Sequence, residues 1–282
     1  MSKDDGWDDW CGLGFYWFQK EVGIRTTPLT CLGELDGLRV KEKVRMVEAV
    51  SALLGQEIEM ANMYRIYAPG SLDDKFYAVE RTGAVFRNLK MFFGDCMPWS
   101  VDIMYSEGLG ATPAFKLTRA ATLTCCCFNR PAAYLTDTED KLLGSLHDPW
   151  TCCGGLDFTI RDPDGNKVLN VGGGIFQCGF WCPLPMLDFK NVRFSITDAK
   201  SGTEVGRMTK KVPSAFKYFF APDVDDYTLE FEGLKEAPPE LKALLMAMTI
   251  FIDFRYFNDN SNDGDARRTA FNTLREQLLS GR

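Results

Sequence analysis

The chain has 282 residues, of which 45% are apolar, so it can form a sizeable core and is not wholly disordered. Its 32 basic and 39 acidic residues leave a net charge of -7, which argues against broad nucleic-acid binding, and we expect no nucleic-acid partner. The single histidine, His147, excludes a multi-histidine metal site, and the sequence has no G-x-S-x-G or Walker-type phosphate loop. We therefore expect that the chain is not an enzyme, with a cysteine thiolate as the one nucleophile left open.

Residues 1–37 hold several aromatic side chains among acids and glycines, without a sustained period, and we expect an N-terminal tail there. The start, Met1 to Asp5, is acidic and is not followed by an apolar stretch, so no signal peptide is expected. Residues 38–54 have apolar positions that fit a strand edge running into a short helix.

After Asn62 short β-rich runs alternate with turn clusters of aspartate, proline and glycine, which is typical of hairpins. The runs pair as 63–67 with 75–80, 99–105 with 114–119, 157–161 with 167–171, and 192–197 with 203–209. The first two pairs resemble the last two, which indicates a duplication. Two copies of an antiparallel sheet can close into one barrel, and closure removes exposed edges.

Ten cysteines are many for this length, and they cluster at Cys125-Cys126-Cys127, Cys152-Cys153 and Cys178/Cys182. Their spacing does not match paired zinc knuckles, and we expect free thiols in a reducing compartment. Each cysteine can be a small buried apolar residue. For the triplet, lipid attachment is the main alternative and zinc a weaker one.

The segment 241–254 decides the architecture, because its stretch Ala243–Ile252 has no charge and is apolar on every side. Such a helix must be buried in protein or in lipid. Crossing a bilayer takes about 20 apolar residues, whereas shorter runs are more often core helices. Lys242 and Asp253 also bracket the run, and a charge in the bilayer is costly. We favour a helix inside a closed barrel over a membrane-spanning helix. Residues 258–282 predict a polar linker and a short amphipathic helix.

Several stretches, in their order and spacing, carry a family likeness. They are Val44–Ala49 leading to Asn62–Tyr67, then Lys75–Glu80, the cysteine triplet, and Asp223–Tyr227 followed by the apolar helix and Ile252–Phe254. On these the chain resembles the phospholipid scramblase family from about residue 38 to 257. The resemblance implies a mainly β, tubby-like fold: a closed antiparallel barrel of about twelve strands around the buried helix, over residues 38–257. It also implies calcium-stimulated movement of phospholipids between leaflets at the cytoplasmic face of membranes, in particular the plasma membrane.

Three candidate sites follow from the resemblance. Cys125, Cys126 and Cys127 match the family's palmitoylated cluster, and stable anchoring takes two or more acyl chains. Asp223, Asp225 and Asp226 match its proposed calcium loop. The twelfth position of that loop is Leu234 rather than an acid, so a calcium site here would be weak, and the alternative is an acidic turn before a strand.

The third candidate site is a basic-aromatic stretch that would meet anionic lipid headgroups through Arg207, Lys210, Lys211 and Lys217. In the family this region also serves in nuclear import, and the alternative is a solvated strand face. The function that we expect is therefore a membrane-associated protein that moves or binds phospholipids. The competing expectation is a tubby-like module that binds anionic headgroups or protein partners without moving lipid. Whether the chain forms oligomers stays open.

Overall fold

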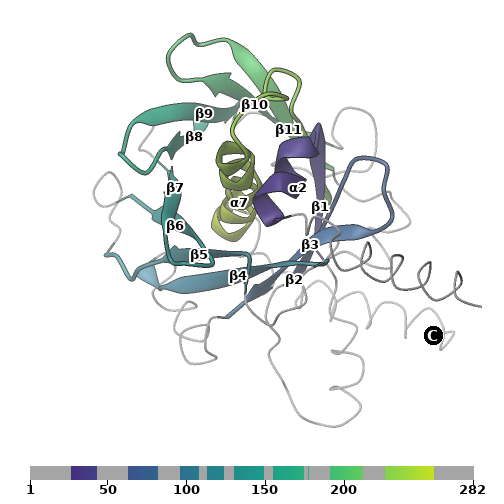
Figure 1. The fold of residues 1–282 in the computed structure, drawn as a ribbon. Coiled ribbons are helices and arrows are strands. Elements are labelled where there is room, and N and C mark those ends of the chain that lie inside the picture. The colour runs from purple at the N-terminus through teal and green to yellow at the C-terminus, as the bar shows by residue number, and fades with distance from the viewer. Residues whose placement is uncertain are drawn as a thin grey trace, which may run out of the picture.

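The computed structural model describes residues 27–42, 63–81, 96–107, 113–123, 130–148, 155–174, 177, 191–211 and 226–256. Over these residues the chain forms a closed antiparallel barrel of twelve strands with a helix inside it (Figure 1). The strands are β1 (Gly37–Glu42), β2 (Met63–Tyr67), β3 (Asp74–Glu80), β4 (Trp99–Tyr105), β5 (Phe115–Arg119), β6 (Ala132–Asp137), β7 (Leu142–His147), β8 (Gly155–Arg161), β9 (Lys167–Gly174), β10 (Asn191–Asp198), β11 (Glu204–Lys211) and β12 (Asp226–Glu230). The predicted fold class is confirmed.

Each strand pairs with its neighbours in sequence, and β1 closes the barrel by pairing with both β12 and β2. All four hairpins expected from the sequence are present, as β2–β3, β4–β5, β8–β9 and β10–β11. Glycines supply the positive φ that tight turns need, at 85° in Gly165 and 70° in Gly202. The two hairpin sets that resemble each other in sequence are offset by six strands, so each set belongs to one half of the barrel.

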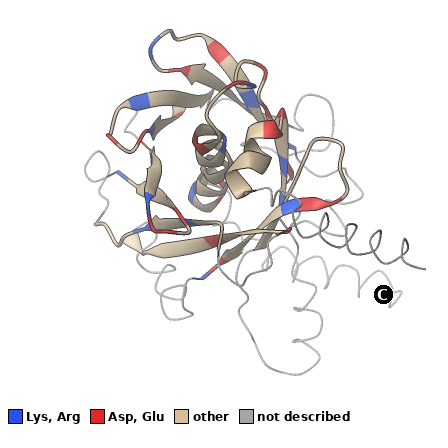
Figure 2. Cartoon of the chain, viewed as in Figure 1, with Lys and Arg blue, Asp and Glu red and all other residues tan. Residues whose placement is uncertain are grey.

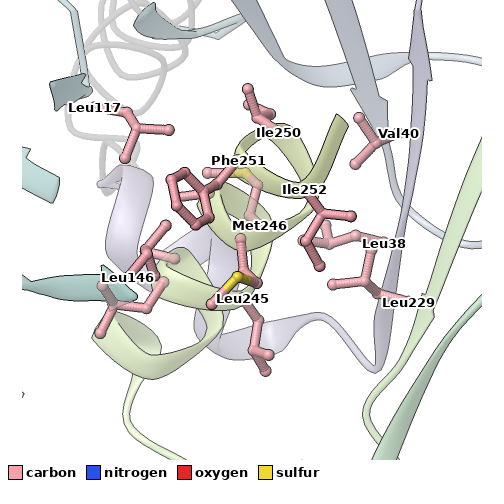
Figure 3. Close-up of a cluster of buried hydrophobic side chains, with 14 of the residues drawn as sticks. Leu38, Val40, Leu117, Leu146, Leu229, Leu245, Met246, Ile250, Phe251 and Ile252 are labelled. Carbon is pink, nitrogen blue, oxygen red and sulfur yellow. The ribbon is translucent and has the colours of Figure 1, made fainter. Parts of the chain in front are cut away.

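Helix α7 (Pro239–Tyr256) runs through the barrel, and every residue from Lys242 to Phe254 is buried. Its charged residues lie only toward its two ends (Figure 2). Between them, apolar side chains from α7 meet inward-facing side chains of strands on different sides of the barrel (Figure 3). A helix that is apolar all round needs this complete enclosure, and the strands provide it.

The close approach of α7 to the barrel wall depends on β7, where Gly144 takes an inward position. A Cβ on Gly144 would lie 2.8 Å from the Leu244 Cδ1 atom of the helix. That Cβ would lie closer still to the Arg161 carbonyl oxygen of β8, and φ of Gly144 is 156°, so the missing side chain makes room for the neighbouring strand as well as for the helix.

The two ends of the barrel differ. One end of the barrel carries the strand ends that are joined in sequence from β1 to β2, β3 to β4, β5 to β6, β7 to β8, β9 to β10 and β11 to β12. We call it the long-connection end, and the last turn of α7 points there. The hairpin turns β2–β3, β4–β5, β6–β7, β8–β9 and β10–β11 lie at the other end, the turn end. This arrangement follows directly from an up-and-down order of strands.

The turn end also holds helix α2 (Pro28–Glu34), which packs beside the first turns of α7 (Figure 1). Thr27 caps it by accepting a hydrogen bond from the Thr30 amide, and Cys31 and Leu32 are buried. Residues 28–34 of the segment expected as a tail thus form a helix that packs against α7. The described residues do not include residues 1–26 of the predicted tail, the short helix predicted after the strand edge within residues 38–54, or the segment 258–282.

Candidate functional site

A buried polar cluster holds the last turns of α7 inside the barrel. The hydroxyls of Tyr64 and Tyr227 donate to the two oxygens of the Asp253 carboxylate, each over 2.6 Å. The Lys210 ammonium lies 3.9 Å from that carboxylate and 5.3 Å from the centroid of the Tyr227 ring. A buried charge is costly unless it is paired and hydrogen-bonded, and here three strands supply the partners. The cluster fixes the helix to β2, β11 and β12.

Lys210 was expected to meet lipid headgroups, and the structure places it elsewhere. In β11 the inward positions are Gly206, Met208 and Lys210, and the Lys210 side chain is 8% exposed. It shares the interior with Asp253, so it is not on the outer surface with Lys211. Its contacts are those of a side chain that holds the helix in place.

At the turn end a second buried cation fixes the start of α7. The Lys242 ammonium donates to the carbonyl oxygens of Gly33, Leu35 and Lys235, over 2.7, 2.9 and 3.0 Å. Burial lowers the pKa of this ammonium. Two of the three carbonyls belong to the end of α2 and the residue after it, so Lys242 ties α2 to α7.

Asp148, just after β7, joins the long-connection end to the last turn of α7. Its buried carboxylate accepts hydrogen bonds from Arg130 over 2.6 Å and from Arg255 over 2.8 Å. The neighbouring His147 shares a hydrogen bond of 2.9 Å with Ser145. Burial lowers the pKa of His147, and the positive charges of Arg161 and Lys167 lower it further. Asp148 thus links the chain before β6 to the last turn of α7, and His147 is paired within β7.

The other residues predicted to bind headgroups are separated. Arg207 faces outward and forms an ion pair of 2.8 Å with Glu204, which raises the pKa of its guanidinium. Lys211 is exposed at the end of β11. Lys217 lies outside the described residues. The structure therefore does not gather the predicted set in one place, and Lys211 is the described member with an open outward position.

Of the predicted calcium ligands, only Asp226 falls in the part of the chain that the structure describes. Its carboxylate forms a two-pronged ion pair with Arg39, in which the Nε atom donates over 2.9 Å and the second nitrogen also contacts the carboxylate. This pair raises the pKa of Arg39. Among the described residues no group of three acidic, histidine or cysteine side chains is arranged to hold a metal. Calcium at Asp226 would have to compete with Arg39.

Cys125, Cys126 and Cys127 also lie outside the described residues. The strands on either side of them are β5 and β6, which end and begin at the long-connection end. Leu123, two residues before the triplet, is 79% exposed. Leu123 and the ends of β5 and β6 on either side of the triplet thus lie at the long-connection end.

The residues that fix α7 inside the barrel were not predicted from the sequence. The alternation of inward and outward residues along β11 could have indicated that Lys210 is buried, because Lys210 lies on the same face of the strand as Met208. The partners of Asp253 had no local signal, since Tyr64 lies 189 residues away in the chain. Arg39 and Asp226 are likewise 187 residues apart.

Within the described ranges, none of the helices combines the length and the apolar character needed to cross a bilayer. A comparison with solved structures found no match. A comparison with family models matched the family named Scramblase over residues 21–259, which includes α2, all twelve strands and α7. The match covers most of the chain, and the chain belongs to the Scramblase family.

Proposed function

We propose that this protein is a membrane-associated scramblase that binds phospholipids and moves them between the leaflets of a bilayer, with calcium as a stimulus. The observation that carries the proposal is the family match over the whole barrel and its helix. Membership of a lipid-transport family also favours transport over bond chemistry. We place the protein at the cytoplasmic face of membranes, including the plasma membrane.

The enclosure of α7 bears on how lipid would move. A headgroup needs a polar path through hydrocarbon. Every residue of α7 from Lys242 to Phe254 is covered by the barrel, so this helix offers no such path in the folded protein. We therefore assign the handling of lipid to the outside of the barrel at its long-connection end.

The attachment that we propose is thioacylation of Cys125, Cys126 and Cys127. One acyl chain gives only marginal binding, whereas two or three give a stable anchor. Replacing all three by serine should abolish hydroxylamine-sensitive acyl labelling and release the protein from cell membranes. The matched control replaces Cys152 and Cys153, which belong to another connection at the same end. Loss of labelling in the control alone would contradict the assignment.

Calcium would act at Asp223, Asp225 and Asp226, in a weak site that displaces Arg39 from Asp226. The support for this site is that the family's proposed calcium loop begins at these acids. The ion pair with Arg39 makes the site weak, because Arg39 competes with calcium for the Asp226 carboxylate. A weak site of this kind would respond to calcium only at high local concentrations.

The second candidate function is that of a module that binds anionic headgroups or protein partners and moves no lipid. The burial of α7 from Lys242 to Phe254 favours it, because a buried helix offers no path for lipid. The deciding experiment reconstitutes the purified full chain in liposomes and follows leaflet exchange of a fluorescent phospholipid, with calcium and with a chelator. The scramblase proposal expects exchange that calcium accelerates. Binding to anionic liposomes without exchange at any calcium concentration would refute it and leave the second function.

A further inference from the structure

We propose that the barrel docks on anionic membranes through a row of outward-facing residues at its long-connection end. The row consists of Lys211 on β11, Asp226 on β12, Lys41 on β1 and Arg65 on β2, and we call it the cationic row. The inference rests on the proposed function, because it names the surface and the lipid class of that function.

The strand register places these residues side by side. Lys211 pairs with Asp226, Asp226 pairs with Lys41, and Lys41 pairs with Arg65. Since neighbouring strands are about 4.8 Å apart, the row is roughly 14 Å long. All four side chains face away from the core, because the buried residues of these strands occupy the alternate positions.

Among the described residues the charge of this surface is positive, although the chain as a whole is acidic. Asp226 is occupied by Arg39, which faces outward two residues before Lys41. Arg65 has a carboxylate of Asp74 at 3.9 Å. Neither Lys41 nor Lys211 has a carboxylate within 4 Å among the described residues. These two lysines are therefore the positive excess of the surface.

Aromatic side chains lie next to the cationic row. Tyrosine and tryptophan are enriched where proteins meet the membrane–water interface. Arg65 pairs in register with Tyr77 of β3, and both Tyr67 and Tyr77 are partly exposed on the outer face. The Lys41 ammonium lies 5.8 Å from the centroid of the Tyr67 ring. Tyrosines beside lysines can lie at the level of headgroups while the ammonium groups meet phosphate or carboxylate.

The charge of the cationic row supports a membrane as the occupant. Lys211 is the last residue of β11 and Asp226 the first of β12, so the row lies at the long-connection end. The exposed Leu123 is at the same end. Leu72, in the β2–β3 turn at the other end, is more exposed still, so the choice of an anionic leaflet as the occupant rests on the charge of the cationic row. Each basic residue near an anionic leaflet adds roughly fivefold to binding, within a Debye length of about 8 Å.

The test uses the full-length, unacylated chain and vesicles of phosphatidylcholine, alone or mixed with phosphatidylserine, in a sedimentation assay. The variant Lys41→Gln/Lys211→Gln removes the excess charge and leaves the Arg39–Asp226 pair intact. The matched control is Lys141→Gln/Lys200→Gln, because both lysines are exposed in hairpin turns at the turn end. Circular dichroism confirms that both variants are folded.

We expect Lys41→Gln/Lys211→Gln to weaken binding to the phosphatidylserine vesicles about 30-fold, and the control to leave it unchanged. The difference should shrink at high salt. Equal effects of the two variants, or wild-type binding that ignores phosphatidylserine, would overturn the proposal. Binding to neither vesicle would also overturn it and favour a protein partner. Leaflet exchange by the wild-type chain, measured in parallel, tests the proposed function separately: binding without exchange refutes that function and leaves the docking surface standing.

Discussion

Removing the tyrosine hydroxyls around Asp253 should loosen the end of α7 by a measurable amount. Tyr64 and Tyr227 each donate one hydrogen bond of 2.6 Å to this buried carboxylate. A hydrogen bond to a charged group contributes about 1.5–3 kcal/mol, and the carboxylate that remains cannot recover it from water. We therefore expect Tyr64→Phe and Tyr227→Phe each to lower the free energy of unfolding by about 2 kcal/mol. For a domain of this size that corresponds to a fall in Tm of roughly 4–8 °C.

The assay is urea unfolding followed by tryptophan fluorescence. Trp99 is a suitable reporter because its ring stacks on Phe254 of α7, with the centroids 4.8 Å apart. Tyr134→Phe is the matched control, since Tyr134 faces outward on β6 and is 44% exposed, and a change within about 0.5 kcal/mol is expected there. The two hydroxyls share one carboxylate, so the double variant should depart from additivity. If both buried variants unfold at the same urea concentration as the wild-type chain, the cluster does not hold the helix.

Three further outcomes are expected. Acidification below about pH 6.5 should lower stability, because burial depresses the pKa of His147 and the unfolded chain takes up the proton first. In His147→Gln the urea midpoint should depend less on pH just below about pH 6.5, and an unchanged pH dependence would contradict the assignment. Gly144→Ala should cost about 1–3 kcal/mol in the same assay, because the new methyl group meets the Arg161 carbonyl oxygen of β8 as well as Leu244, and wild-type stability would mean that β7 does not lie this close to β8 and the helix. Arg39→Gln should tighten calcium binding about two- to fivefold in calorimetry by removing the competitor of Asp226, and weaker binding would show that Arg39 supports the site instead.

Much of the fold could be predicted from local patterns. The turns around Gly165 and Gly202 mark their hairpins, and the uncharged run Ala243–Ile252 identifies the core helix. β6 and β7 were not recognised, because the turn between them, residues 138–141, contains neither glycine nor proline. α2 was missed because it is one short helix, although Thr-Pro at its start is a usual N-terminal signal.

The candidate sites were harder to predict, because closure of the barrel decides which residues lie together in them. Lys210 and Lys211 are adjacent in sequence, yet one faces the interior and the other the surface, as alternation in a strand requires. The cationic row joins residues near both ends of the described chain, since β1 lies between β12 and β2. A motif in the linear sequence cannot reveal such a row, because its residues are far apart in the chain. The register of the paired strands reveals it.

The arrangement of the two ends suggests how one barrel separates stability from membrane contact. At the turn end, Lys242 ties α2 to α7. At the long-connection end, Asp253 and Asp148 hold the last turns of α7 from inside, which leaves the outer surface free to carry Lys41 and Lys211. Substitutions at the inner groups should therefore change stability, and substitutions in the cationic row should change membrane binding.

Hydrogen exchange of α7 tests the central claim, that the barrel itself shelters this helix. The measurement follows the backbone amides of residues 242–254 by mass spectrometry in the purified, detergent-free chain, with sedimentation confirming a monomer. The account predicts that these amides exchange only through global unfolding and that added vesicles leave their protection unchanged. Rapid exchange in water that slows only when a bilayer is added would show that lipid, rather than the strands, covers the helix.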